Sequence, residues 1–178
     1  MVIDPKQTSS TWKIEGLGAD GPDSKFKDEL MLFGQFVGDW EIVKARYVQG
    51  DGSWAEMSGE VHFGWILGGL AIQDVWTGHR LGIEKIGMFG TTIRFYDPKI
   101  GAWRSTWLSP MNGLVQLFIG KKVGDRIVLE LQNPVKYPAR WVFSEISSES
   151  FRWHAEETHD GKDWILTEEM QICKVKRI

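Results

Sequence analysis

Hydrophobic and polar positions alternate in short runs along most of the chain after Gly38. The runs are rich in valine, isoleucine, threonine and aromatic residues, and clusters of glycine, proline, asparagine and aspartate separate them, which is typical of strands joined by turns. Most of the connections are short, whereas a parallel crossover needs about a dozen residues or more. The runs predict ten strands, at 39–48, 54–66, 70–77, 88–96, 103–109, 114–122, 126–132, 139–146, 151–158 and 163–175.

Ten sequential antiparallel strands would leave two exposed edges unless the sheet closes on itself. The pattern therefore predicts an all-β fold, an up-and-down antiparallel β-barrel of about ten strands. Residues 1–23 are polar, carry glycine and proline, and are expected to form an irregular N-terminal arm. No repeat or linker indicates a second domain, so residues 24–178 are expected to form a single barrel domain.

One segment departs from the two-residue alternation. Asp23 or Ser24 can cap a helix, and Gly38 can end it. Apolar residues recur between them at roughly helical spacing, which predicts a short N-terminal helix that plugs or flanks the barrel. These apolar residues are Phe26, Leu30, Leu32, Phe33 and Phe36.

The composition contains 10 tryptophans in 178 residues. Each brings a large apolar surface and one N–H group that needs a partner, so several are expected to line a cavity or a wet interface. The net charge of −3 gives no broad basic field, which argues against nucleic-acid binding. Cys173 is the only cysteine, which fits a reducing cytoplasm. No segment is apolar and long enough to span a bilayer.

Turn chemistry at Gly68-Gly69 sets the register of the surrounding hairpin. A two-residue turn there places six residues on one face, which is the better candidate for the interior and leaves Asp74 among apolar groups. A slip of one residue would exchange the faces and bring Glu60 and His62 inside instead. The preferred inner face consists of Val61, Phe63, Trp65, Ile72, Asp74 and Trp76.

The next hairpin has its loop at 97–102. A loop shorter by one residue would set Arg94 opposite Arg104, and like charges directly opposite each other are unfavourable. The preferred inner face mixes indole, phenol, guanidinium and hydroxyl groups, which suits a cavity that orients a ligand. That face consists of Thr92, Arg94, Tyr96, Trp103, Ser105 and Trp107, and the alternative face of Ile93, Phe95, Arg104, Thr106 and Leu108.

Asp160-Gly161 predicts a tight turn near the C-terminus. Such a turn places Trp153 opposite Glu168 and directs both inward. On the other face it pairs Arg152 with Glu169, which belongs in solvent, and His154 is expected to point outward. In the strand 139–146, two pairs compete for the interior, and the pattern leaves the choice open: Trp141 with Phe143, or Val142 with Ile146.

The first strand opens with Gly38-Asp39-Trp40 just after the predicted helix, and this resembles the Gly-x-Trp start of the lipocalin and fatty-acid-binding (calycin) superfamily. In that superfamily the tryptophan closes the base of the barrel and a basic residue near the C-terminus packs over it, a place that Lys176 or Arg177 would take here. The run of strands, including GEVHFGW, AIQDVW and TTIRFYDP, is also similar to bacterial lipocalin-like domains of uncharacterised function. The resemblance covers roughly residues 25–178 and implies a lipocalin-like barrel.

Three side chains are candidates for acid-base chemistry. Asp74 and Glu168 are expected inside, where a dry aromatic surrounding raises a carboxyl pKa and suits proton transfer. The alternative for Asp74 is a structural ion pair with Arg94. His62 shares a strand face with Glu60, which could orient its imidazole, or the two form an ordinary pair on the outer wall.

The four histidines show no metal-ligand spacing, and the glycine clusters do not form a phosphate-binding loop. No metal or cofactor is therefore expected. Haem is the one exception worth weighing, because some lipocalin-like ten-stranded barrels carry it on a histidine, but no residue here clearly matches such a motif.

Three functions compete on this scaffold. The first is an intracellular carrier, sequestering protein or sensor for a small, largely apolar or aromatic molecule. The second is a cofactor-independent isomerase, cyclase, lyase or hydratase that uses Asp74, Glu168 or His62 in the same cavity, because fold alone does not decide function. The third is a fully packed barrel that binds another protein, and a homodimer is the common default assembly. The expected ligand contacts are Trp65, Trp76, Arg94, Tyr96, Trp103, Trp107 and Trp153.

The connection His79–Gly87 is the longest between two predicted strands and carries glycines. It is a candidate for a lid over the barrel mouth.

Overall fold

A computed structural model describes residues 17–80 and 87–175 of the chain. Ten antiparallel strands account for most of these residues, as the alternation of apolar and polar positions predicts. The strands are β1 (Gly38–Val48), β2 (Trp54–Ile66), β3 (Ala71–Arg80), β4 (Gly87–Asp97), β5 (Ala102–Ser109), β6 (Leu114–Val123), β7 (Arg126–Leu131), β8 (Ala139–Ser144), β9 (Ser150–Glu157) and β10 (Ile165–Lys174).

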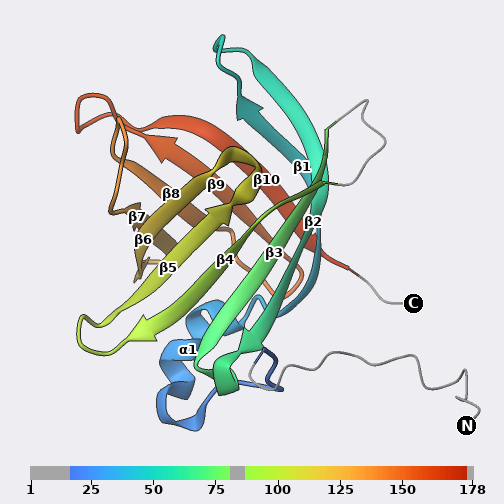
Figure 1. Ribbon diagram of the computed structural model, residues 1–178, viewed down its shortest axis with the longest axis vertical. Helices are drawn as coiled ribbons and strands as arrows, with labels where there is room; N and C mark the ends of the chain where they lie inside the picture. The colour runs from blue at the N-terminus through green and yellow to red at the C-terminus, as the bar shows by residue number, and fades with distance from the viewer. Residues whose placement is uncertain (1–16, 81–86, 176–178) are drawn as a thin grey trace, which may run out of the picture.

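Every strand pairs with its neighbours in sequence, and β1 also pairs with β10, so the sheet closes into a barrel (Figure 1). The closing pair runs from Trp40 opposite Lys174 to Tyr47 opposite Glu168. A bulge in β1 near Ile42 shifts the register on both of its sides. The prediction of an all-β, ten-stranded, up-and-down barrel is confirmed, and no edge strand is left unpaired.

A short helical segment covers one end of the barrel (Figure 1). It begins as a 3₁₀ turn over Ser24–Phe26, where the Asp23 carboxylate accepts a hydrogen bond from the backbone N–H of Lys25, at 2.8 Å. It continues as α1 (Lys27–Gly34), which is shorter than the predicted helix. Gly34 ends α1 where the ring of Trp65 lies too close for any side chain, 2.5 Å from where a β-carbon would be. We call this end of the barrel the closed end, and the opposite end the open end.

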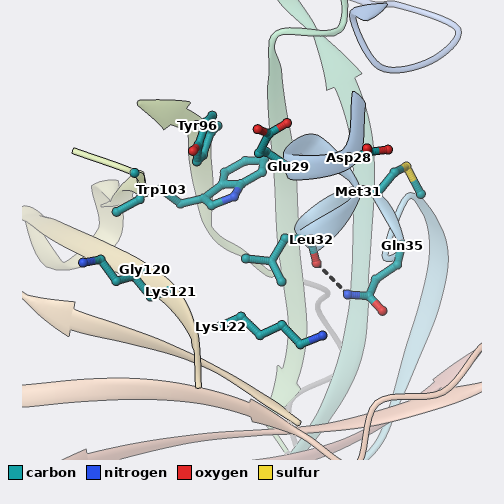
Figure 2. Close-up of a pocket in the computed structure, with 12 residues that line it drawn as sticks. Asp28, Glu29, Met31, Leu32, Gln35, Tyr96, Trp103, Gly120, Lys121 and Lys122 are labelled. Carbon is teal, nitrogen blue, oxygen red and sulfur yellow. Dashed lines mark hydrogen bonds between the residues drawn. The ribbon is translucent and has the colours of Figure 1, made fainter. Parts of the chain in front are cut away.

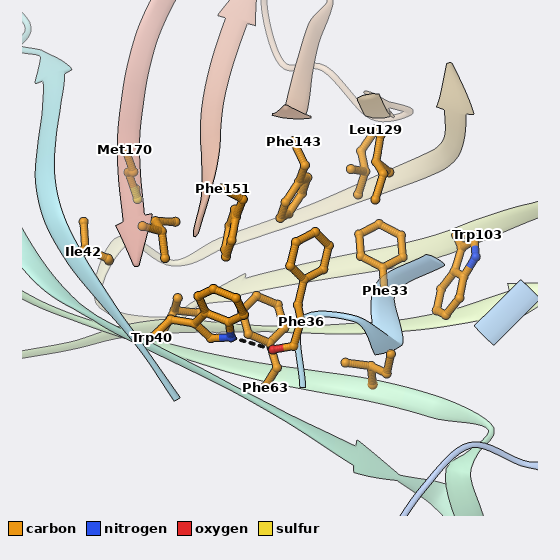
Figure 3. Close-up of a cluster of buried hydrophobic side chains, with 14 of the residues drawn as sticks. Phe33, Phe36, Trp40, Ile42, Phe63, Trp103, Leu129, Phe143, Phe151 and Met170 are labelled. Carbon is orange, nitrogen blue, oxygen red and sulfur yellow. Dashed lines mark hydrogen bonds between the residues drawn. The ribbon is translucent and has the colours of Figure 1, made fainter. Parts of the chain in front are cut away.

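Aromatic side chains from α1 and from the strands form the core at the closed end (Figure 3). Phe33 of α1 and Phe36, in the turn just after α1, reach the interior and are almost fully buried. The indole N–H of Trp40 donates to the backbone carbonyl of Phe36, at 2.6 Å, which ties the helical segment to the start of β1. The Lys174 ammonium lies 5.4 Å from the centre of the Trp40 ring. Lys174 thus occupies the place expected for Lys176 or Arg177, both of which lie outside the described residues.

Two predicted hairpin registers are confirmed. In β2–β3, Phe63 lies opposite Asp74 and Val61 opposite Trp76. The turn Gly68-Gly69 has positive φ at both glycines, which is the backbone that a two-residue hairpin requires. In β4–β5, Arg94 lies opposite Ser105 as predicted, and Asp97 and Ala102 also pair, so the loop is shorter than the predicted 97–102 while the register is unchanged. The two preferred inner faces are therefore the observed ones, and Phe95 on the alternative face is exposed.

The predicted register of the last hairpin is wrong. Trp153 lies opposite Met170, and Glu168 lies opposite Ala155, with a bulge in β10 before Glu168. Asp160 does not form a two-residue turn, because its carboxylate accepts hydrogen bonds from the N–H groups of Lys162 and Asp163, at 2.8 and 2.9 Å. These bonds stabilise a longer loop. Since the shift amounts to two residues at Trp153, both Trp153 and Glu168 keep their inward orientation.

The structure settles the inner face of β8, which the pattern left open. In β8, Trp141 and Phe143 join the interior cluster, and Val142 lies on the other side of the strand. β3 and β4 extend to Arg80 and from Gly87, so they shorten the predicted loop at 79–87. The candidate lid itself falls on residues 81–86, outside the described residues. No helix in the described ranges is long and apolar enough to cross a membrane.

Candidate functional site

The inward-facing tryptophans divide between the two ends of the barrel. At the closed end, Trp65 and Trp103 are 7% and 2% exposed. Trp65 packs against α1, and Trp103 meets the edge of the Phe33 ring at a centroid distance of 4.9 Å. These two predicted ligand contacts lie in the packed core.

An ion pair between Arg94 and Asp74 lies beside this core. Arg94 Nη2 is 2.6 Å from Asp74 Oδ2, and both side chains are almost fully buried. Burial raises the pKa of Asp74, while the guanidinium and Thr92 oppose the rise. Because an arginine guanidinium keeps its proton in proteins, we take the pair to be charged. Asp74 thus has the geometry expected of a structural ion pair with Arg94, and its catalytic role stays a prediction.

Two phenylalanine rings of the closed end, Phe33 of α1 and Phe63 of β2, cover the guanidinium of Arg94. The guanidinium carbon lies 4.9 Å from the centre of the Phe33 ring and 5.6 Å from that of Phe63. Nε and Nη1 are buried and have no hydrogen-bond partner among the described residues. The faces of the two phenylalanine rings therefore supply part of the interaction that a buried cation needs. This arrangement makes Arg94 depend on α1 for its surroundings.

Towards the open end, four tryptophans form a continuous row inside the barrel. Trp76 contacts Trp107, Trp107 contacts Trp141, and Trp141 contacts Trp153, with ring centroids 6.3, 5.9 and 5.3 Å apart. β5 and β8 are not neighbours in the sheet, so the contact between Trp107 and Trp141 must cross the interior. We call these four residues the indole row.

The tryptophans of the indole row contact one another but are not fully buried. All four tryptophans retain intermediate solvent exposure, in contrast to Trp40 and Trp103 at the closed end. Since their side chains point inward, solvent reaches the inner surface of the barrel at this end. Each indole plane is tilted by 67–75° from the next, so both ring faces and ring edges line this surface.

Glu168 is the carboxyl group of the open end. It lies opposite Tyr47 on β1 and Ala155 on β9. Ala155 is two residues from Trp153, so Glu168 and Trp153 lie on the same face of the β9–β10 pair. Burial raises the pKa of its carboxyl to about 7, and no cation among the residues that the structure describes lowers it. None of the described residues forms an ion pair or a hydrogen bond with its side chain. Near neutral pH this group can therefore both accept and release a proton.

His62 lies on the outer wall, away from the interior. Its Nδ1 is 2.9 Å from an Asp39 carboxylate oxygen, and its Nε2 is 3.1 Å from one of Glu60. About 41% of its side chain is exposed. The preferred register, which directs Phe63 inward, places the neighbouring His62 outside. The structure thus does not bring His62 together with Asp74 or Glu168.

A groove of about 560 Å³ lies at the closed end, between α1 and the ends of β4, β5 and β6 (Figure 2). Tyr96 and Trp103 form part of its wall. Asp28 and Glu29 line it from the helix, and two lysines line it from β6. Tyr96 also contacts Phe26 and Trp103, at 5.9 and 6.4 Å between ring centroids. The predicted ligand contact Tyr96 therefore belongs to this groove and not to the indole row.

The sequence did not assign two contributors to the open end. Trp141 touches both Trp107 and Trp153, and Phe118 packs against Trp141 with ring centroids 4.2 Å apart and planes tilted by 33°. The face of β8 was ambiguous because Val142, on the side opposite Trp141, is also buried. A signal for Phe118 was available: it lies opposite Ser105, whose inward orientation the preceding hairpin already fixes.

Metal binding finds no support in the described ranges, where no three histidine, cysteine, aspartate or glutamate side chains cluster suitably for an ion.

The chain matches no protein-family model, and no curated protein is significantly similar to it in sequence. Similar solved structures include an S-type phycobiliprotein lyase, CPES, from Guillardia theta, with 11% identity and a TM-score of 0.58 over 83% of this chain and 93% of that one. Another is Rv2717c from M. tuberculosis, with 13% identity and a TM-score of 0.61 over 83% and 97% of the two chains. At these identities the likeness shows a shared fold and nothing finer.

The buried ion pair makes a stability prediction. Asp74→Asn leaves the Arg94 guanidinium buried without its counter-ion, and the free energy of unfolding should fall by about 3–5 kcal/mol. The double variant Asp74→Leu/Arg94→Met removes both charges and should lose less than the single variant. Urea unfolding at pH 7 measures both losses. If the free energy of unfolding of Asp74→Asn lies within about 1 kcal/mol of that of the natural protein, the two charges are not in contact.

Glu168 makes a pH-dependent prediction. Its pKa is about 7 in the folded protein against 4.5 for the free side chain, so the folded state binds this proton more tightly than the unfolded state does. Stability is therefore lost as the pH rises from about 4.5 through 7, and stays at the lower level above that. Glu168→Gln avoids this loss. At pH 8 it should be more stable than the natural protein by about 1–3 kcal/mol, allowing for the solvent that reaches the group.

The measurement is the difference in unfolding free energy between the two proteins from pH 4.5 to 8, which cancels the titration of other groups. The control is Glu56→Gln, which makes the same substitution at an exposed position of the outer wall. A constant difference for Glu168→Gln would mean that Glu168 has an ordinary pKa.

Proposed function

We propose that this barrel binds a small, largely apolar or aromatic molecule inside its open end, as a carrier, a sequestering protein or a sensor. The indole row is the observation that carries the proposal. Inward-facing tryptophans at the closed end are packed out of solvent, whereas those of the indole row keep part of their surface exposed. A guest that covers this apolar surface gains the corresponding free energy of burial.

The arrangement of the rings supports an aromatic guest in particular. Successive indoles are steeply tilted, so a flat molecule can meet the face of one ring and the edge of the next. Both are favourable geometries for aromatic pairs. The similar structures lend general support only, because their likeness to this chain is one of fold.

A second function has one specific observation in its favour. Glu168 lies in the same apolar surroundings with its pKa raised to about 7, which suits a general acid or base in an isomerase, cyclase, lyase or hydratase. Enzyme and binding protein would share one site. They differ in whether Glu168→Gln abolishes turnover of a bound molecule while its affinity is kept.

Binding can be tested with N-phenyl-1-naphthylamine, a neutral aromatic probe whose fluorescence rises in apolar sites. The proposal expects saturable binding at one site. Trp141→Leu should weaken it about tenfold or more, because Trp141 is the centre of the indole row and a tenfold loss corresponds to about 1.4 kcal/mol. The measurement is a fluorescence titration of each variant.

The matched control is Trp54→Leu. Trp54 is 40% exposed and stacks on Arg46, outside the interior cluster. Its loss should leave the affinity within about twofold, on the same scale of free energy. Equal affinity for both variants would place the probe elsewhere on the molecule and remove the support for an interior site.

A further inference from the structure

The charges at the open end are distributed unevenly between the inside and the outside of the barrel. Glu168 faces inward and has no charged partner among the described residues. The arginines on the alternate, outward positions of the nearby strands are all paired. Arg46 and Arg152 both contact Glu169, and Arg140 contacts Glu156 at 2.7 Å. These three arginines are therefore engaged by carboxylates of the outer wall and do not neutralise the inner carboxyl group.

The surface around Glu168 has a second property that points in the same direction. The faces of indole rings carry negative electrostatic potential and attract cations, and aromatic cages of this kind bind ammonium groups. The indole row presents such faces at steep angles to one another, and Trp153 lies on the same inner face of the β9–β10 pair as Glu168. Carboxylate and indoles thus favour the same type of guest.

We infer that the open end selects a cationic guest, a small aromatic or alkyl molecule with a protonated amine placed between Glu168 and the indole faces. This inference rests on the proposed function and names the ligand class. A guest ammonium would supply the counter-ion that Glu168 lacks inside the barrel. An anionic guest would instead bring a like charge next to the carboxylate.

The deeper charges do not reverse this selection. Arg94 is the inward-facing cation at the closed end, and Asp74 already contacts it at 2.6 Å. Phe33 and Phe63 cover its guanidinium. The pair contributes no net charge, so among the charged side chains that the structure describes, Glu168 sets the sign of the interior field at the open end.

Three probes of the same shape test the inference by isothermal titration calorimetry at pH 8. They are 2-naphthylmethylammonium, the neutral 2-naphthalenemethanol and the anionic 2-naphthoate. The cation should bind at least about tenfold more tightly than the alcohol, and the naphthoate more weakly than both. Glu168→Gln should reduce the affinity for the cation about tenfold and leave that for the alcohol within about twofold.

The matched control is Glu169→Gln, which removes the neighbouring carboxylate from the outer wall and should leave the order of the three affinities unchanged. The natural protein alone gives the selectivity, so the test does not depend on the folding of a variant. Equal affinity for cation and alcohol, or preference for the naphthoate, would overturn the inference and leave the proposed function standing. If none of the three binds, and N-phenyl-1-naphthylamine does not saturate either, the proposed function fails together with it.

Discussion

The pairing of β1 with β10 is the constraint on which the rest of the structure depends. It closes the sheet, and closure gives every strand an inner and an outer face. Alternate side chains of strands that are not neighbours can then meet across the interior, as Trp107 and Trp141 do. The same pairing brings Glu168 beside Tyr47. The outer ion pairs of Glu169 with Arg46 and Arg152 join β1, β10 and β9 across this seam.

The two ends of the barrel interior differ in the side chains that fill them. At the closed end, Phe33 and Phe36 supply rings that the strands do not, and the core becomes dense enough to bury a charged pair (Figure 3). At the open end the strands supply their own aromatic groups, and these stay partly in contact with solvent. One barrel thus combines a structural core with a surface suited to a guest, and the helical segment determines which end is which.

Much of this arrangement could be predicted from local chemistry. The glycines of Gly68-Gly69, and the like charges that a shorter loop would place opposite each other at Arg94 and Arg104, favoured the observed registers of two hairpins. The inner faces of these hairpins could be preferred but not fixed, because a slip of one residue exchanges them. The predicted register of the last hairpin was wrong because an aspartate can either occupy a tight two-residue turn or accept backbone hydrogen bonds in a longer loop. Asp160 accepts hydrogen bonds from two backbone N–H groups instead of forming a tight turn, and sequence alone does not distinguish these.

The candidate site was predicted less well, because its members meet through contacts distant in sequence. Trp65, Trp103, Arg94 and Asp74 have the expected orientation, but α1 covers them, and alternation within a strand does not reveal which end a helix occupies. Trp141 was left undecided because both faces of β8 bury apolar residues. The inward orientation of Glu168 was predicted, while its isolation from cations depends on how three strands distribute their arginines.

The bond from the Trp40 indole to the Phe36 carbonyl has a consequence for traffic through the molecule. It ties the turn after α1 to the start of β1, so the helical segment is a fixed part of the barrel and does not swing open. The barrel is therefore blocked at its closed end. The guest proposed above would therefore enter and leave by the open end, and one molecule would have to depart before the next could bind.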